Sequence, residues 1–468
     1  MVFSSMTFLC VFLPVVLLLY YILPNLHMKN GLLIIVSLLF YAYGEPVYVL
    51  LMLLSIAINY LFGRMLGTEK QSFRKTVVIL ATVVNLGMLF VFKYVDMVLR
   101  TINQISHSEI PMTNLVLPIG ISFFTFQALS YVIDVYRGDA KIEKSIFGVM
   151  LYIAFFPQLI AGPIVKYHDI HEQIRERKAD VREIAEGMRR FIIGLSKKTL
   201  ISNTMAAVAD TLFAVEPGNL NILSAWIAAI AYMFQIYFDF SGYSDMAIGM
   251  GHMFGFTFQE NFNYPYISGS IKEFWRRWHI SLSTWFKEYL YIPLGGNRKG
   301  KVRTCINKLV VFFSTGLWHG ANWTFVIWGL WHGFFMLLEE VIPVKKMPKV
   351  LRHIYALLVV CLGFVLFRAD TFTQGIQVIG RMFTGWSFEL AQMQIVSAQL
   401  TPVFILTAVV AVIGSMPVIP KIKAKAEGTE KSAGIFAPVS YLISIVLLLL
   451  CMMSLSSGTY NPFIYFRF

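Results

Sequence analysis

Hydrophobic residues along this chain fall into long runs that are separated by short polar and basic segments. The runs cover residues 6–23, 31–44, 46–63, 76–95, 115–134, 146–165, 191–213, 222–240, 305–318, 321–341, 353–368, 402–419 and 435–454. A helix that crosses a hydrocarbon core of ~30 Å needs roughly 20 apolar residues. Because several runs are short or interrupted by Gly and Pro, the pattern predicts an all-α polytopic membrane protein. We expect about 11 spanning helices, together with re-entrant and interfacial helices.

The composition supports this fold class and bounds the number of domains. Hydrophobic residues make up 57% of the chain, charged residues make up only 14%, and the mean hydropathy is +0.66. Soluble domains contain about 25% charged residues. We therefore expect one integral membrane domain over residues 1–468 and no soluble domain. The first apolar run has no basic n-region and no small-residue cleavage site, so it is interpreted as a spanning helix rather than a signal peptide.

Basic residues indicate the orientation of the chain in the membrane. If the N-terminus lies outside, 34 of the 39 Lys and Arg residues fall in inside loops, at residues 24–30, 64–75, 137–144, 166–198, 257–308, 342–352 and 421–431. Lys and Arg gather in the cytoplasmic loops of membrane proteins. We therefore predict a multi-pass protein of the cell membrane with its N-terminus outside and its basic loops in the cytoplasm. The same rule accounts for the net charge of +13 without a nucleic-acid partner.

One apolar run does not fit a simple crossing of the membrane. Residues 146–165 have basic loops at both ends and contain Pro157, Gly162 and Pro163. Irregular backbone at membrane depth is tolerated only where protein or a water-filled cavity surrounds it. This run is therefore predicted to be a re-entrant hairpin that lines a cavity.

The sequence gives no reason to expect a metal site or a disulfide framework. The cysteines are scattered in or beside apolar segments, and no pair has metal-binding or redox spacing: Cys10, Cys305, Cys361 and Cys451. The histidines closest to the membrane segments include no pair spaced i, i+4 and no adjacent carboxylate pair with the spacing of metal ligands: His252, His279, His319 and His332.

Two carboxylates lie in or beside an apolar run, in the sequence FDFSGYSDMAIG. Asp239 and Asp245 would each cost ~3 kcal/mol or more near the bilayer centre, so they should face the protein interior or a water-filled cavity. Asp245 is a candidate substrate-binding residue. The alternative is that both aspartates accept hydrogen bonds from the amides of a broken helix. The glycines that follow predict such a break or a second re-entrant segment: Gly242, Gly249, Gly251 and Gly255.

Residues 271–289 have the pattern of an amphipathic helix. One face carries the apolar side chains Ile271, Phe274, Trp275, Trp278, Leu282, Trp285, Phe286 and Tyr289, and the other face is mostly basic. Such a helix suits the cytoplasmic membrane interface. His279 lies at the margin of the two faces, where it could point into the mouth of a cavity, and Trp278 beside it is a candidate substrate-binding residue. The following turn, GGNRKG, offers amides and cations to a phosphate.

The sequence Gly-Leu-Trp-His-Gly occurs twice, at residues 316–320 and 329–333. A separation of thirteen residues turns a continuous helix by about 220°, so His319 and His332 should point in different directions. We favour His319 as the functional residue because flanking glycines allow a substrate to approach closely. Trp318 and Asn322 nearby are candidate substrate-binding residues. His332 is expected to be a hydrogen-bonded packing residue.

Four segments together carry a resemblance to a known family. FDFSGYSDMAIG, FWRRWHISLSTWFKEYLYIPLGG, GLWHGANWTFVIWGLWHG and the terminal YNPFIYFRF resemble the membrane-bound O-acyltransferases. They are most similar to the branch that O-acetylates alginate, cellulose or peptidoglycan, and the resemblance runs nearly from end to end. It implies a ring of helices around a tunnel that crosses the membrane. It also implies that His319 matches the family's catalytic histidine and that His279 matches a second histidine on the cytoplasmic side of the tunnel.

The resemblance also implies partners and a donor. The acyl group would come from a cytosolic donor, with acetyl-CoA expected and no cofactor bound tightly. It would leave towards the outside for a polysaccharide. In this branch an extracytoplasmic acetyltransferase of the serine-hydrolase type completes the transfer. This chain carries no such domain, so a separate partner is implied. The external segment 370–400 is long enough to contact it, and membrane lipid surrounds the helices.

Acyl transfer needs a base, and neutral imidazole titrates near the working pH. Asn322 or a Trp N–H could polarise the thioester carbonyl. Two other functions stay open. A transferase of the same fold could move D-alanine from a carrier protein to teichoic acid. A glycan transporter or flippase could line its path with the same polar residues, but it predicts internal repeats of spanning helices. The chain shows only the short Trp-His-Gly echo.

Overall fold

The computed structural model describes residues 2–160, 162–427, 430–458, 460–462 and 464. These residues form helices and connecting segments without any strand, which confirms the predicted all-α class. They divide into two compact units. Unit 1 comprises Met1–Phe191 and Ser244–Gln259, and unit 2 comprises Ile192–Tyr243 and Glu260–Phe468.

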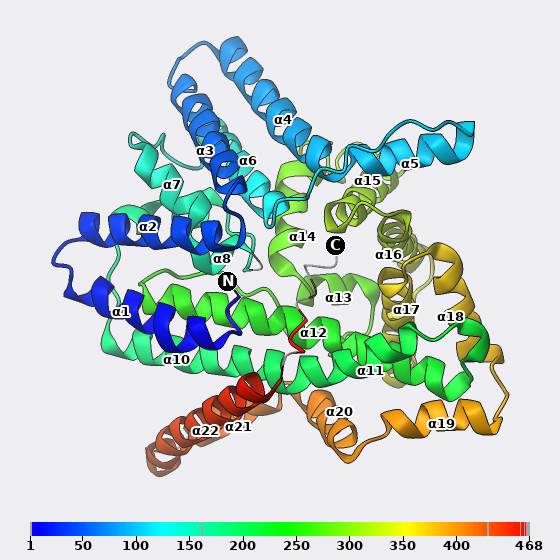
Figure 1. Cartoon of the computed structure of the whole chain (residues 1–468). Coiled ribbons are helices and arrows are strands. Elements are labelled where there is room, and N and C mark those ends of the chain that lie inside the picture. Colours follow the sequence, from blue (N-terminus) through cyan, green and yellow to red (C-terminus); the bar gives the residue numbers. More distant parts are fainter. Residues whose placement is uncertain (1, 161, 428–429, 459, 463, 465–468) are drawn as a thin grey trace. The chain divides into compact units, whose positions relative to one another are not determined.

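Unit 1 contains the N-terminal helices. They are η1 (Phe8–Phe12), α1 (Leu13–Ile22), α2 (Leu26–Gly44), α3 (Tyr48–Met65), α4 (Gln71–Lys93), α5 (Val95–Ser106), α6 (Ile121–Arg137), α7 (Ile146–Ala154), α8 (Phe156–Leu159), α9 (Tyr167–Arg175) and most of α10 (Val181–Ser196). Figure 1 shows them in blue to green-cyan.

Unit 2 contains the rest of the chain. Its helices are η2 (Lys197–Ser202), α11 (Asn203–Phe213), η3 (Pro217–Asn219), most of α12 (Ile222–Met253), η4 (Pro265–Ile267), α13 (Ile271–Arg277), α14 (Ile280–Phe286), η5 (Lys287–Tyr291), α15 (Lys301–His319), α16 (Trp323–Val341), η6 (Val344–Lys346), α17 (Lys349–Arg368), α18 (Phe372–Thr384), α19 (Leu390–Gln399), α20 (Pro402–Gly414), α21 (Val418–Glu427) and α22 (Glu430–Ser457). The predicted external segment 370–400 is thus largely helical, as α18 and α19.

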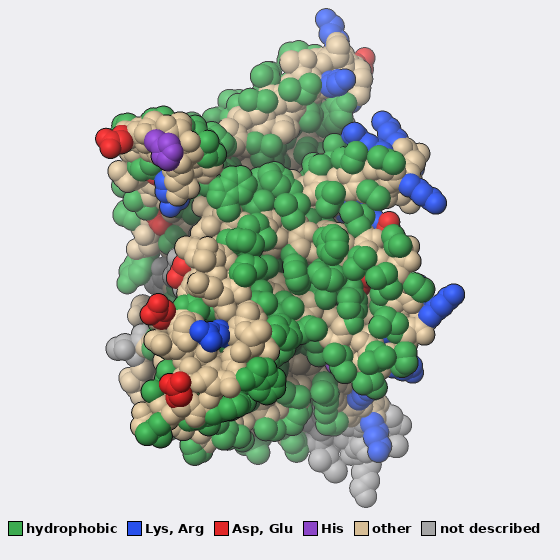
Figure 2. All heavy atoms as spheres, turned by 90° about the vertical axis from the view of Figure 1, so that its right-hand side faces the viewer, with side chains coloured by type: hydrophobic (Ala, Val, Ile, Leu, Met, Phe, Trp, Pro, Cys, Tyr) green, Lys and Arg blue, Asp and Glu red, His purple; other side chains and the backbone are tan. Residues whose placement is uncertain are grey.

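Six described helices are long and apolar enough to cross a membrane: α2, α3, α4, α12, α17 and residues Pro438–Ser457 of α22. The pair α19 and α20, bent by 64°, raises the number to seven if it counts as one span. The predicted number of about 11 spans is therefore not confirmed, although the membrane class is. Hydrophobic side chains cover a large part of the surface drawn in Figure 2.

The broken run at residues 146–165 has an irregular centre. Helix α7 stops at Ala154, and the short α8 begins at Phe156. The Tyr152 hydroxyl on α7 donates to the carbonyl oxygen of Val165 at 2.8 Å, so the end of the run folds back onto α7. This fold-back agrees with the hairpin that the two prolines predict, because Pro removes a backbone donor and interrupts a helix.

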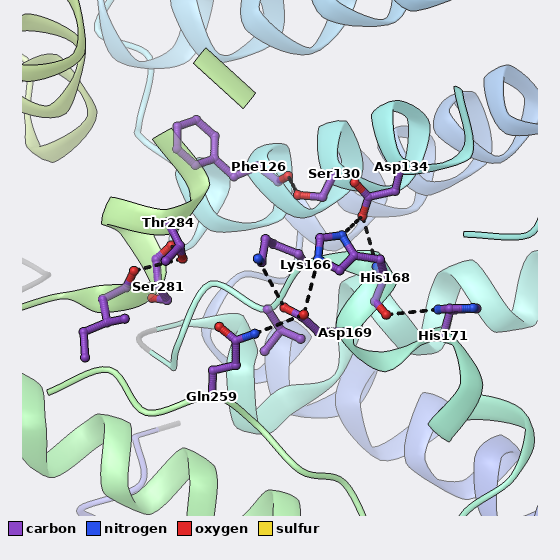
Figure 3. Close-up of polar contacts among 12 residues, drawn as sticks. Phe126, Ser130, Asp134, Lys166, His168, Asp169, His171, Gln259, Ser281 and Thr284 are labelled. Carbon is purple, nitrogen blue, oxygen red and sulfur yellow. Dashed lines mark hydrogen bonds and ion pairs between the residues drawn. The ribbon is translucent and has the colours of Figure 1, made fainter. Parts of the chain in front are cut away.

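A polar cluster fixes α9 against α6 within unit 1 (Figure 3). The Asp134 carboxylate, fully buried on α6, accepts hydrogen bonds from the backbone N–H of His168 at 3.0 Å and contacts its Nδ1 at 3.0 Å. Asp169 lies 3.4 Å from the other ring nitrogen, and Gln259 donates to Asp169 at 3.0 Å. The bond from Asp134, followed by the charges of both aspartates, raises the pKa of His168 above its usual value.

The predicted break after Asp239 is wrong, because α12 continues without interruption from Ile222 to Met253. The glycines serve close packing instead. A Cβ atom on Gly242 would lie 2.7 Å from the carbonyl oxygen of Gly194, and one on Gly249 would lie 2.6 Å from that of Gly187. Small residues at such positions let two helix backbones approach each other.

The predicted single amphipathic helix over residues 271–289 is also wrong. Helix α13 ends at Arg277, and His279 adopts φ +44° and ψ +54° before α14 begins. This left-handed conformation is uncommon outside glycine and ends a helix. All eight residues of the aromatic face are buried, with exposures between 0% for Ile271 and 8% for Tyr289. The aromatic face is therefore buried inside the protein rather than exposed on a membrane surface.

Helices α15 and α16 lie side by side in Figure 1 and form an antiparallel pair joined by three residues. The first glycines of the two repeats meet where the helices cross. A Cβ atom on Gly329 would lie 2.2 Å from the carbonyl oxygen of Phe312 and 3.1 Å from the backbone nitrogen of Gly316. The repeat therefore has a structural cause, since glycine at both positions allows the close approach.

Candidate active site

The antiparallel arrangement separates the two histidines of the repeat. Each histidine lies three residues after its glycine, which is about 4.5 Å along a helix axis, and the two helices run in opposite directions. His319 is therefore carried to the end of α15, and His332 is carried into the middle of α16. The prediction that the two side chains occupy different surroundings follows from this geometry.

His319 is 7% exposed and is enclosed by aromatic rings. Its ring centroid lies 5.0 Å from Trp318, 5.1 Å from Trp328 and 5.3 Å from Phe367, each in an edge-to-face arrangement. The ring of His279 lies 6.2 Å away. The structure thus brings together both histidines that the sequence singled out as catalytic candidates.

His279 is fully buried, and the residue that orients it is Asn261. The backbone N–H of Ser281 donates to Asn261 Oδ1 at 3.2 Å, which identifies that atom as the acceptor. His279 Nδ1 lies 3.2 Å from the same oxygen and must therefore carry a proton. Its Nε2 has no hydrogen-bond partner among the described residues. Burial, followed by the charge of His319, lowers the pKa of His279 well below its usual value, so the ring is neutral and Nε2 is free to accept.

His332 is fully buried among aromatic side chains. Its ring is stacked on Phe274 at 6.0 Å and lies 5.2 Å from Trp328 and 5.3 Å from Trp275. The packing role is as expected, but the expected hydrogen bond is wrong. Neither ring nitrogen has a partner among the described residues, because only rings and the backbone of Gly363 approach it.

A cavity of about 10 Å³ lies beside His319. Its walls include Trp278, Trp328, Phe240 and Phe367, together with Ile464 from the C-terminal segment. This volume is close to that needed by one water molecule. Trp278 therefore shares the cavity with His319. Trp318 contacts both catalytic candidates, since its ring also lies 5.8 Å from His279.

The other two substrate-binding candidates lie in different surroundings. Asn322 caps α16, because its Oδ1 accepts from the backbone N–H of Thr324 at 3.1 Å. Its amide nitrogen donates to the carbonyl oxygen of Asp370 at 3.1 Å. Asp245 belongs to unit 1, where Arg190 donates to it at 2.9 Å and 3.2 Å.

The neighbouring carboxylate, Asp239, forms a buried ion pair with Lys198 at 2.6 Å, and the two side chains are 2% and 1% exposed. Its other oxygen accepts from the backbone N–H of Ile464 at 2.9 Å. The two aspartates of FDFSGYSDMAIG thus form ion pairs with the side chains of Lys198 and Arg190, rather than hydrogen bonds with the amides of a broken helix. Each cation offsets the cost of a carboxylate removed from water.

Sequence analysis missed several residues of this site. Asn261 lies 18 residues before His279, and no motif marks it. Trp328 stood in the repeat region without an assigned role, although it contacts both histidines of the repeat. Lys198 was one of many basic loop residues. The terminal segment YNPFIYFRF was noticed, but nothing in it indicated a place beside the cavity for Ile464.

Comparison with known proteins agrees with this geometry. Residues 46–345 match the family described as MBOAT, membrane-bound O-acyltransferase. A histidine pair enclosed by aromatic rings beside a cavity suits acyl transfer. The chain belongs to the membrane-bound O-acyltransferase family and is an O-acyltransferase.

Its relatives act on polysaccharides by name. A probable alginate O-acetylase of Azotobacter vinelandii is 39% identical over 100% of both chains. A probable alginate O-acetylase of Pseudomonas aeruginosa is 44% identical over 88% of this chain and 80% of its own length. A peptidoglycan O-acetyltransferase of Helicobacter pylori is 37% identical over 82% of this chain and 80% of its own length.

Proposed function

We propose that this protein takes an acetyl group from cytosolic acetyl-CoA and passes it across the membrane for O-acetylation of an extracytoplasmic polysaccharide. The observation that carries the proposal is the pair His279 and His319, with ring centroids 6.2 Å apart beside a cavity lined by apolar side chains. The O-acetylase and O-acetyltransferase names of relatives that cover 82% to 100% of the chain support acetyl as the acyl group and a polysaccharide as its destination.

The proposed reaction uses His319 as the catalytic base. Its imidazole takes the proton of an acceptor hydroxyl, whose oxygen attacks the thioester carbonyl carbon. The C–S bond breaks, and the leaving thiolate takes the proton from the imidazolium. An ester and a free thiol thus replace the hydroxyl and the thioester, and His319 is neutral again. A positioned base of this kind typically contributes ~10²–10⁴-fold to the rate. His279, which is neutral and oriented by Asn261, assists by accepting a hydrogen bond through Nε2.

A donor for the developing oxyanion can also be proposed. Trp328 lines the cavity beside His319, and its indole N–H has no hydrogen-bond partner among the described residues. A buried N–H without a partner costs free energy unless a ligand satisfies it. We therefore assign polarisation of the carbonyl to Trp328, while Trp278 and Trp318 confine the acyl group. Asn322 and Asp245 remain substrate-binding candidates that are not among the residues lining this cavity.

Two larger cavities of unit 2 have the chemistry of a CoA site. One, of about 460 Å³, is lined by Trp275 and Phe286 together with Lys287 and Lys308. The second, of about 430 Å³, is strongly basic and is lined by Arg277, Lys345 and Arg352. Lys272 and Arg276 line both cavities, so the two adjoin. CoA joins an apolar pantetheine arm to a phosphate-rich nucleotide, which fits one apolar and one basic compartment.

The larger cavity also approaches the proposed catalytic residue. Thr315 lines it and lies four residues before His319 on α15, about 6 Å along the helix axis. The second cavity is lined by residues of 257–308 and 342–352, the loops whose basic residues predict a cytoplasmic position, and the larger cavity combines residues of 257–308 with residues of α15 and α16. A donor would therefore enter from the cytosol, and no cofactor needs to be bound permanently.

We further propose that residues 1–468 act as one acyltransferase domain in the cell membrane, with the N-terminus outside and the basic loops in the cytoplasm. The family match at residues 46–345 supports this, because it includes residues of both units. A serine-hydrolase-like acetyltransferase outside the membrane is the proposed partner that completes transfer to the glycan. Membrane lipid is proposed to surround the helices of this chain.

The test begins with a strain that lacks this protein and has lost an acyl modification of its surface polymer. The intact chain should restore acetyl esters, and H319A, inserted to the same level, should not. Restoration by H319A would refute the catalytic assignment. Recovery of D-alanyl esters would replace the proposal by the teichoic-acid function. Altered polymer export with unchanged esters would favour a transporter.

The donor site has its own test. In membranes containing the full chain, K272E together with R276E should raise the KM for acetyl-CoA by about tenfold or more, because each removes a charge-assisted contact to phosphate. K346E together with K349E, at two exposed residues outside both cavities, is the matched control for the change in charge. Equal KM values for the two variants would show that these cavities do not hold CoA.

A further inference from the structure

The C-terminal segment, residues Tyr460–Asn461–Pro462 and Ile464, is held to unit 2 at successive points. The Tyr460 hydroxyl donates to Asp210 at 2.6 Å, and Asn461 Oδ1 accepts from Asn203 at 3.2 Å. The carbonyl oxygen of Pro462 accepts from the ammonium group of Lys198. The backbone N–H of Ile464 donates to Asp239 at 2.9 Å.

The last two contacts use the buried ion pair described above. Lys198 and Asp239 lie 2.6 Å apart, and each also forms a hydrogen bond to the backbone of the C-terminal segment. A buried ion pair is stable only when further hydrogen bonds satisfy both partners. The pair therefore fixes the backbone on both sides of residue 463, independently of the side chains there.

This anchoring puts the side chain of Ile464, 5% exposed, into the wall of the cavity beside His319. The other walls belong to α12, α15, α16, α17 and the α13–α14 junction. Ile464 is thus the cavity residue contributed from outside these elements. With it in place, the cavity measures about 10 Å³.

We propose that Ile464 determines which acyl group the enzyme accepts, and that Lys198 and Asp239 are the positioning residues that hold it there. This proposal rests on the proposed function, in which a thioester carbonyl lies beside His319. Beyond that carbonyl, acetyl carries one methyl group, which suits a space of about one water molecule. Propionyl and butyryl groups would overlap the Ile464 side chain.

The experiment uses the purified full-length chain in proteoliposomes. Acetyl-, propionyl- and butyryl-CoA are supplied in turn, and CoA release that depends on His319 is measured by subtracting the rate of H319A. I464A should raise the ratio of propionyl to acetyl rates by about tenfold or more, since one methylene in an apolar pocket discriminates by roughly 10–200-fold. I464V should raise it less, and I464F should depress acetyl release.

A second variant tests the anchor without leaving a lone buried charge. K198M combined with D239L replaces the ion pair by apolar side chains, a change that buried pairs often tolerate. It should raise the same ratio, because the segment loses both backbone contacts. V378A, which removes buried volume from the same unit away from the cavity, should leave the ratio unchanged.

The possible failures are distinguishable. If the intact chain releases no CoA from acetyl-CoA, the proposed donor is wrong. If acetyl release is normal but I464A and I464V keep the ratio within twofold of the intact chain, the assignment of Ile464 is wrong. If I464A falls equally with all three donors, as V378A would, Ile464 only packs and the proposal is overturned.

Discussion

The two copies of Gly-Leu-Trp-His-Gly are identical in sequence and differ in what surrounds them. In the first copy, His319 ends α15, meets the ring of His279 and borders a cavity. In the second copy, His332 is enclosed by Phe274, Trp275 and Trp328 and does not line the cavity beside His319. Gly316 and Gly329 explain why the motif occurs twice, because both lie where α15 and α16 cross. The position of His319 at the end of α15 explains why only this histidine borders the cavity. A repeated motif can therefore record a packing requirement while only one copy carries function.

The largest expected effect separates the two histidines by rate. H319F should lower the acetyl-transfer rate by ~10²–10⁴-fold, because the base is lost while the aromatic volume is kept. H332F should retain most of the rate, because its ring packs without any hydrogen bond among the described residues. Rates are measured with membranes that contain equal amounts of each variant. A loss of equal size in H332F would remove the distinction between the two copies.

The next effect concerns the residue that orients His279, which has no counterpart near His332. N261A should lower kcat by up to ~10²-fold with little change in KM, because His279 keeps its place but loses its orientation. A steady-state analysis against acetyl-CoA distinguishes these parameters. N221A is the control, because Asn221 is buried and its side chain contacts Ser224 and Met393 rather than the histidines. A rise in KM alone would mean that Asn261 serves donor binding.

Stability should respond to the glycines that the two copies share. G329A should destabilise the protein by about 1–3 kcal/mol, because its Cβ atom would meet the Phe312 carbonyl oxygen at 2.2 Å. G333A should cost less, since its nearest neighbour is a side-chain atom at 3.1 Å. Thermal unfolding of the purified protein measures both. Equal melting temperatures for G329A and G333A would contradict the crossing point of α15 and α16.

The smallest effect uses a histidine that, unlike these two, is partly exposed and lies beside two carboxylates. The folded-state pKa of His168 is raised by its bond to Asp134, so its stabilising contribution is present below about pH 6.5 and is lost as the pH rises through the raised pKa. The difference in melting temperature between the intact protein and H168N should shrink from about pH 5.5 to about pH 8.5. A difference independent of pH would exclude the charge as its source.

Much of the fold followed from hydrophobic patterning, because lipid and protein both select apolar helices. The fold class and the irregular run near Pro157 were predicted. The positions at which helices are interrupted were harder to predict. Gly242 and Gly249 were taken as breaks, but glycine within a helix also permits close contact, and only the neighbouring backbone distinguishes these uses. The break before α14 was missed, because an aromatic stripe persists through it.

The residues of the candidate site were predictable where they lie close together in the sequence. They were not predictable where only the tertiary fold brings them together. The geometry around His319, Trp318 and Trp278 came from residues already suspected from their sequence. Asn261, Lys198 and Ile464 contribute through contacts over 18 to 264 residues, which leave no periodic or compositional signal. Asn322 was suspected for its amide, yet its amide caps a helix, a use that a position just before an apolar run also predicts.

The left-handed backbone at His279 has a consequence for mutational scanning of this position. At φ +44°, glycine, asparagine and aspartate are accommodated far better than β-branched residues. A library of all substitutions should therefore yield two separate tolerance profiles. Abundance in the membrane should survive with glycine, asparagine or aspartate and fall with valine or isoleucine, whereas enzyme activity should survive only with histidine. Substitutions that keep abundance but lose activity would show the chemical requirement for histidine at this position. Substitutions that lose both would show the requirement imposed by the backbone conformation.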